Sequence, residues 1–252
     1  MSIELYSVIL TYLSWLAPSL TGLAMLIFGI LIITNPVKST KVLGIGFVLS
    51  AVNAILGSAN TFSVRFIGME QYARFSAANS IIGMIISFLS LVTICVYIHK
   101  NYGHRLIYLP LLLIQFGGTV IDRAVVFLLA KNLNSGMNTG LWLSLVGIID
   151  GFVISAVISI IIIVVFWKNK EKENVIPKTY LIRTICLLCG VIGTGIDVLV
   201  YLQQIFDKEP VQSMENLYML NSIAGRGVAL IFPVYVLIMV FKASKNRSGE
   251  AV

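Results

Sequence analysis

The sequence carries little charge. Only 12% of its 252 residues are Asp, Glu, Lys or Arg, whereas 58% are hydrophobic and the mean hydropathy is +0.95. A soluble domain needs roughly a quarter of its residues charged to coat its surface. This composition therefore excludes an ordinary soluble globular protein.

Histidine and cysteine are also scarce, which limits the chemistry. The two histidines fall in one polar break, and the three cysteines, Cys95, Cys186 and Cys189, fall inside apolar runs. A multi-histidine metal or haem site and a disulfide framework both need more such residues, placed elsewhere. The motifs Gly-x-Ser-x-Gly and His-Glu-x-x-His are absent as well. We therefore expect no metal, no cofactor and no enzymatic activity.

Apolar runs long enough to cross a bilayer recur along the chain. A helical crossing needs about 20 residues, and short polar breaks separate the runs. The predicted spans are 16–34, 42–62, 76–99, 106–130, 140–167, 180–205 and 216–241. The predicted fold class is therefore all-α, a seven-transmembrane helix bundle. Its setting is a cell membrane, either a plasma membrane or a prokaryotic inner membrane, with the lipid bilayer as its surroundings.

The predicted domain organisation follows from these runs. Residues 1–15 form an interfacial N-terminal segment, because 3–34 is too long for one untilted span and Pro18 can mark the entry into the membrane. Residues 16–242 form the seven-span membrane domain, and 243–252 form a cytoplasmic tail, too short for an output domain. The N-terminus lacks the basic start of a cleavable signal, so we expect it to be retained.

The distribution of Lys and Arg predicts the orientation, because basic residues are held on the cytoplasmic side. Twelve, Arg183 among them, follow the first, third, fifth and seventh runs, and four lie on the other side. We expect the N-terminus outside and the C-terminus in the cytoplasm. The net charge of +7 is then mainly a topology signal, and no basic face predicts a nucleic-acid partner.

Polar residues recur inside the runs. Odd-numbered runs carry Ser-x-x-Gly, at 19–22, 80–83, 144–147 and 222–225. Even-numbered runs carry a hydroxyl residue three positions before an amide or acid, at 50–53, 119–122 and 194–197. One interpretation is a helical hairpin copied about three times in parallel orientation. The other is convergence on small residues that let membrane helices approach closely.

Five ionisable residues lie inside the predicted spans at a shared depth, between the midplane and the outer surface, and one asparagine occupies the matching place in the second run. These six residues are Asn53, Asp122, Arg123, Asp150, Asp197 and Arg226. A charge at the bilayer centre costs at least ~2.5 kcal/mol, so such residues usually face the bundle interior and are partnered or functional. We predict that the six form a ligand-binding site reached from the outer side.

The acid and base at 122 and 123 cannot pair with each other, because about 100° of helix separates neighbouring positions. We predict that Arg123 pairs with Asp150 and Arg226 with Asp197, because sequential antiparallel helices are usually neighbours in space. Asp122 is then left over. An unpartnered acid in a low dielectric holds its proton until a cation replaces it, so Asp122 is the predicted proton or cation carrier.

Narrow polar stripes accompany these charges, since positions three, four and seven apart share one face of a helix. The fourth run aligns Gln115, Gly118, Thr119 and Asp122, and the sixth aligns Gly190, Gly193, Thr194, Asp197 and Tyr201. The second run offers Gly46, Ser50, Asn53, Gly57 and Asn60. Such stripes are typical of helices that turn one polar strip toward a shared interior.

The leading functional prediction is a transporter or permease for a small polar solute or ion. An alternative is a ligand-sensing receptor or accessory subunit, in which the same site binds the ligand and the basic loop at 168–183 contacts a cytoplasmic partner. A third interpretation is that the charges only clamp helices together, because paired Asp and Arg are often purely structural. The sequence leaves these three open.

Overall fold

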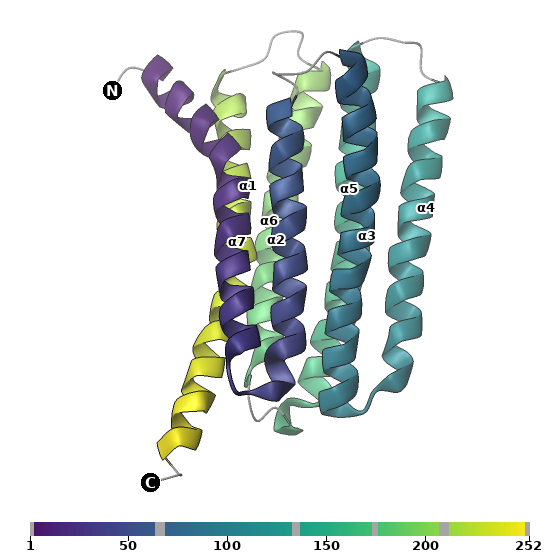
Figure 1. Cartoon of the computed structure of the whole chain (residues 1–252). Coiled ribbons are helices and arrows are strands. Elements are labelled where there is room, and N and C mark those ends of the chain that lie inside the picture. The colour runs from purple at the N-terminus through teal and green to yellow at the C-terminus, as the bar shows by residue number, and fades with distance from the viewer. Residues whose placement is uncertain (1–2, 64–68, 133–136, 173–175, 207–211, 250–252) are drawn as a thin grey trace.

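The computed structural model describes residues 3–63, 69–132, 137–172, 176–206 and 212–249 (Figure 1). For some residues within these ranges, Asp122 and Arg123 among them, it describes the main chain only. The α-helices are α1 (Ile3–Thr34), α2 (Lys41–Ser63), α3 (Met69–Tyr102), α4 (Tyr108–Asn132), α5 (Met137–Lys168), α6 (Thr179–Phe206) and α7 (Gln212–Gly249). Three 3-10 turns, η1 (Lys38–Thr40), η2 (Arg105–Ile107) and η3 (Lys170–Lys172), complete the described secondary structure, which contains no strand.

The prediction of an all-helical fold is confirmed for the described residues, and the long apolar helices are consistent with a multi-pass membrane protein. Within the described residues, six helices are long and apolar enough to cross a membrane, all except α4. The apolar stretch described in α4, Tyr108–Ile121, is shorter. The chain is thus a multi-pass helical protein by length and composition. The seventh crossing and the orientation remain predictions.

The outer surface of the bundle supports a lipid environment. Large apolar side chains lie exposed on it, including Leu106 at 85%, Phe206 at 73% and Ile192 at 65%. Contiguous apolar surface of this extent is rare on soluble monomers. Since a helix satisfies its own backbone hydrogen bonds, it can present such a surface to hydrocarbon at little cost.

The helices are arranged as a ring of sequential neighbours (Figure 1). Each helix packs on the next one in the chain, and α1 packs on α7, which closes the ring. The contact between α3 and α4 is the sparsest of the sequential pairs, and α4 stands at the edge of the bundle in Figure 1. The ring therefore has one weak seam, between α3 and α4.

Helices α1 and α2 approach each other closely at two glycines. A Cβ atom on Gly44 would lie 2.8 Å from the carbonyl oxygen of Gly29, and one on Gly29 would lie 2.8 Å from the carbonyl oxygen of Gly44. The turn between the helices is fixed by Asn35, whose side-chain oxygen accepts a hydrogen bond from the Val37 amide at 3.1 Å. Small residues thus allow the backbones to meet, as in many membrane helix pairs.

Aromatic rings pack closely at one end of the bundle, where α3 is followed by α4 and where α5 has its C-terminal end. The ring of Phe166 packs edge-on against Tyr102 with ring centroids 5.6 Å apart, and Tyr97 packs on both. Leu111 and Ile162 beside them are fully buried. Such packing holds this end of the bundle rigid, since protein cores are as dense as organic crystals.

Neither predicted domain boundary coincides with the end of a helix. Helix α1 runs without interruption through Pro18, although Figure 1 shows its N-terminal part inclined away from the rest. That part contacts α7: Gln212 donates a hydrogen bond to the Ser7 hydroxyl at 2.8 Å. Helix α7 continues to Gly249 and extends past the ends of the other helices in Figure 1. A proline commonly bends a helix without ending it.

Candidate ligand-binding site

Two of the six predicted site residues make contacts between helices. The Asn53 amide on α2 donates a hydrogen bond to the Ser87 hydroxyl on α3 at 3.3 Å. The Asp197 carboxylate on α6 accepts one from the Asn221 amide on α7 at 2.8 Å. These polar residues therefore join neighbouring helices in pairs.

The other four predicted residues are placed differently. Asp150 is half-buried on α5 and forms no hydrogen bond with the described residues, and Arg226 is exposed on α7. The side chains of Asp122 and Arg123 lie outside the described residues, as does the predicted pair of Arg123 with Asp150. Of the four predicted residues whose side chains the structure describes, Asn53, Asp150, Asp197 and Arg226, none lines the four main cavities of the bundle.

The predicted pair of Arg226 with Asp197 is wrong. No ion pair joins them, and Asn221 takes the place next to the carboxylate. Asn221 and Arg226 are five positions apart, which turns their side chains about 140° from each other around the helix. Once Asn221 faces α6, Arg226 must point elsewhere.

Asparagines that precede two of the Ser-x-x-Gly motifs have similar roles. Asn79 donates to the carbonyl oxygen of Leu56 at 2.7 Å, and Asn221 donates to that of Gly193 at 2.8 Å. Each amide thus links an odd-numbered helix to the helix before it. The two carbonyls are not equivalent, because Leu56 follows Asn53 by three residues whereas Gly193 precedes Asp197 by four. The hairpin repeat accordingly stays a prediction.

Sequence reasoning misplaced one residue that the structure brings to the bundle interior. Arg183 was counted with the basic cytoplasmic loop at 168–183, although the predicted sixth span, 180–205, also contains it. In the structure it lies inside α6, four residues after the first residue of that helix, Thr179. Its side chain lines two cavities. The central cavity, of about 370 Å³, is bounded by α1, α2, α3, α6 and α7, and the α5 cavity, of about 390 Å³, by α3, α4, α5 and α6.

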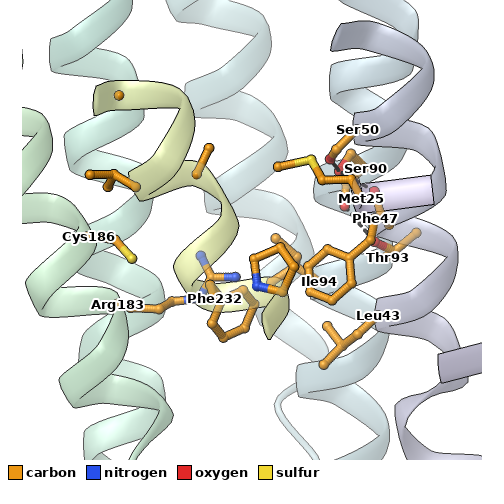
Figure 2. A pocket seen from close by; sticks show the side chains of 15 residues that line it. Met25, Leu43, Phe47, Ser50, Ser90, Thr93, Ile94, Arg183, Cys186 and Phe232 are labelled. Atoms are coloured by element: carbon orange, nitrogen blue, oxygen red, sulfur yellow. Dashed lines mark hydrogen bonds between the residues drawn. The ribbon is translucent and has the colours of Figure 1, made fainter. Parts of the chain in front are cut away.

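The charge of Arg183 has no partner within the described part of the chain. Its Nε is buried and forms no hydrogen bond, and no ion pair or other hydrogen bond engages the guanidinium. Its described contact is with the ring of Phe232, whose centroid lies 4.1 Å from the guanidinium carbon (Figure 2). Among the residues whose side chains are described, no acid lines either cavity. Within that part of the chain, Arg183 is a cation without a counter-ion.

Hydroxyl groups face Arg183 across the central cavity (Figure 2). The Ser50 and Ser90 hydroxyls share a hydrogen bond at 3.2 Å, which joins α2 to α3, and the Thr93 hydroxyl donates to the Ser90 carbonyl at 2.7 Å. A Cβ on Gly46 would collide with Thr93, so only glycine lets the helices meet here. These hydroxyls bond to each other and to backbone carbonyls, so they form a rigidly held polar wall opposite the guanidinium.

The α5 cavity is also polar. Gln115 and Thr119 of α4 line it opposite Ser155 and Ser159 of α5. The Thr119 hydroxyl donates to the Gln115 carbonyl of its own helix at 2.7 Å, whereas the Gln115 amide forms no hydrogen bond in the described residues. That amide is free to donate to a ligand. Gln115 and Thr119 belong to the predicted polar stripe of the fourth run, which thus faces a cavity as expected.

A signal for Arg183 was present in the sequence. It lies seven residues before Gly190 and therefore extends the polar stripe of the sixth run by two turns, through Cys186. Its position next to the basic break at 167–178 concealed this relationship. A cation at the end of a polar stripe is a better candidate for the bundle interior than one in a loop.

The two cavities have the size of ligand-binding sites. Both cavities have volumes within the usual range for ligand sites, about 300–1,000 Å³. Among the residues described, no group of three or more His, Cys, Asp or Glu is placed to hold a metal ion. The chemistry that remains is recognition of negative charge by Arg183 with hydroxyl and amide donors around it.

Comparisons with known proteins assign no family to the chain. Its sequence matches no protein-family model, and neither curated proteins nor solved structures give a significant match. The functional conclusion therefore depends on the geometry of the bundle interior.

Proposed function

We propose that this protein is a membrane transporter for a small organic anion, which binds to Arg183 in the interior of the bundle. The observation that carries the proposal is the unpaired guanidinium between two polar cavities. The proposal retains the predicted class of function, a transporter for a small polar solute or ion. It moves the binding site from the outer layer of charges to Arg183.

The cost of the unpaired charge supports a ligand. Withdrawing a cation from water costs several kcal/mol, whereas the contact with Phe232 returns about 0.5–2 kcal/mol. Intramembrane charges without partners usually mark a functional site. An oxyanion can supply the missing partner, because the guanidinium binds carboxylate and phosphate groups with two parallel hydrogen bonds.

The position of Arg183 between two cavities favours transport over catalysis. A ligand held there can be approached through the central cavity or through the α5 cavity, which different sets of helices bound. Small residues form part of both walls, Gly225 in one and Gly147 and Gly151 in the other. Pro233 also lines the central cavity, and its ring removes the hydrogen bond that the Ala229 carbonyl would otherwise accept. Helix α7 is therefore weakened at the site, which suits a helix that moves.

The test is solute uptake into proteoliposomes that contain the purified protein. Carboxylates of one to three charges are compared with neutral and cationic solutes of similar size. We expect uptake of an anion that falls at least tenfold in Arg183→Gln, because removing one partner of a buried charge pair costs more than 2 kcal/mol. Arg226→Gln is the matched control, since Arg226 is exposed and lines none of the four cavities.

Two outcomes separate the alternatives. Anion binding that depends on Arg183 without any flux assigns a sensor or accessory subunit in place of a transporter. Uptake that is lost in Asp122→Asn but unchanged in Arg183→Gln assigns the predicted outer site and overturns the proposal. A variant is compared only if its thermal unfolding shows that it is folded.

A further inference from the structure

The weak seam between α3 and α4 contains an apolar groove. This seam groove, of about 450 Å³, is lined on α3 by residues such as Met84 and Phe88 and on α4 by residues such as Phe116 and Val120. Met84, Phe116 and Val120 are exposed on the outer surface of the bundle. In a membrane the groove therefore opens toward lipid.

The seam groove is linked to Arg183 by residues that line more than one cavity. Gln115 and Thr119 line both the seam groove and the α5 cavity, and Arg183 and Ile94 line both the α5 cavity and the central cavity. The three spaces thus form a row from the lipid-facing surface to the unpaired cation. The wall of the seam groove is mostly hydrocarbon, whereas the walls of the α5 and central cavities also carry amide, hydroxyl and guanidinium groups.

We propose that the transported anion is amphiphilic, a single hydrocarbon chain with an oxyanion head, and that it enters from the bilayer through the α3–α4 seam. The chain occupies the seam groove, and the head passes Gln115 to reach Arg183. This inference rests on the proposed function, because it assumes that Arg183 binds an anion. It adds the class of substrate and the route of entry.

The apolar wall explains why the ligand has a hydrocarbon chain. A chain that moves from lipid into the seam groove stays in apolar surroundings, so it leaves the bilayer at little cost. A fully hydrophilic anion gains nothing from this wall and would have to lose its water there. The sparse packing of α3 on α4 also means that few contacts have to break for the seam to widen.

The polar end of the row explains why the head is an oxyanion. The amide of Gln115 forms no hydrogen bond within the described residues, so it can donate to the head as the head leaves the seam groove. Arg183 then supplies the charge, and no acidic side chain in the described part of the bundle lines any of the three spaces to repel the head. Carboxylate and phosphate heads share the chemistry that this row recognises.

Photo-crosslinking in bilayers tests the route with the unaltered protein. The probe is a long-chain fatty acid with a diazirine midway along its chain, and the labelled peptides are identified by mass spectrometry. We expect label concentrated on 84–89 of α3 and 116–120 of α4, displaced by excess long-chain carboxylate or alkyl phosphate. An alkylamine of equal length should displace it at least tenfold less well. Label spread evenly over all lipid-facing helices, or displaced equally by the amine, overturns the inference.

A substitution that fills the groove provides the second test. Val120→Trp places a large ring in the seam groove, and Val153→Trp is the matched control, because Val153 is equally exposed on α5 but lines none of the cavities. We expect Val120→Trp to lower uptake of a long-chain carboxylate at least fivefold and to leave uptake of a short, water-soluble carboxylate unchanged. Both variants are first checked for cooperative thermal unfolding.

The two proposals fail in different ways. If short carboxylates are taken up with dependence on Arg183 but Val120→Trp has no effect on long-chain uptake, the lateral route is wrong and the proposed function stands. If Arg183→Gln leaves uptake of every anion unchanged, the proposed function itself is wrong, and the inference is withdrawn with it.

Discussion

The guanidinium of Arg183 lies against the face of the Phe232 ring, with 4.1 Å between the guanidinium carbon and the ring centroid. The two residues come from α6 and α7, and both line the central cavity. A cation–π contact offsets only part of the cost of burying a cation, about 0.5–2 kcal/mol. The interior of the bundle therefore holds a charge that the described residues compensate only in part.

We predict that Arg183→Leu stabilises the ligand-free protein. Replacing an unsatisfied buried charge with a side chain that fills similar space should raise the free energy of unfolding by about 1–3 kcal/mol. Chemical unfolding in mixed micelles measures this difference. A gain in stability together with a loss of uptake is the pattern expected of a functional site. If Arg183 were a structural clamp, the substitution would lower stability instead.

Cys186 reports the electrostatic potential of the central cavity, which it lines one turn from Arg183. We predict that an anionic methanethiosulfonate reagent modifies Cys186 about tenfold faster than a cationic one, because a cleft of one charge concentrates ions of the opposite sign. The preference should disappear in Arg183→Gln. Mass spectrometry of a Cys189→Ala background gives the rates, and Cys95, fully buried, should stay unmodified in the folded protein. Equal rates for both reagents would show that Arg183 does not control the cavity.

Asn221 joins α6 to α7 through two hydrogen bonds of 2.8 Å, to the Gly193 carbonyl and the Asp197 carboxylate. We predict that Asn221→Leu lowers the free energy of unfolding by about 1–2 kcal/mol, since hydrogen bonds between membrane helices contribute on average ~0.6 kcal/mol each and a carboxylate loses its donor. Arg226→Gln should change stability by less than about 0.5 kcal/mol. A comparable loss of stability in Arg226→Gln would instead indicate an ion pair between Arg226 and Asp197, which the structure lacks.

Two glycines of α2 distinguish close packing from open surface. A Cβ on Gly44 meets Gly29 and Ile33 at 2.8 Å, whereas one on Gly57 meets nothing within 4 Å. We predict that Gly44→Ala lowers the free energy of unfolding by about 1–3 kcal/mol, because the helices must separate. Gly57→Ala should be neutral or raise it by up to ~1 kcal/mol through better helix propensity. Both differences can be measured in the same micelle assay, and equal effects would contradict the close contact of α1 with α2.

Several parts of the fold followed from local sequence. Each of the α-helices overlaps one predicted run, because a long apolar segment in lipid has few alternatives to a helix. The end of α3 was also marked: Gly103 has φ +76, and its amide bonds back to the His99 carbonyl at 2.9 Å. Glycine takes this left-handed conformation without strain and commonly ends a helix.

The candidate site was predictable only in part. The stripe that contains Gln115 and Thr119 faces a cavity as expected, because residues three to four apart share a helix face whatever the helix packs against. The predicted pair of Arg226 with Asp197 is wrong because the adjacency of two helices in the sequence does not determine which of their faces meet. Arg183 was missed because a basic residue near a polar break has the same pattern as a loop residue.

The sequence by itself determined which segments form the helices, that their outer surfaces are apolar, and which small and polar residues share a face. Those properties depend on neighbours within one or two turns. The tertiary structure decided how each helix is rotated about its axis and how far it is shifted along it. These choices place Asn221 rather than Arg226 beside Asp197, and Arg183 between two cavities. They depend on the packing of all the helices at once, which no single run of sequence contains.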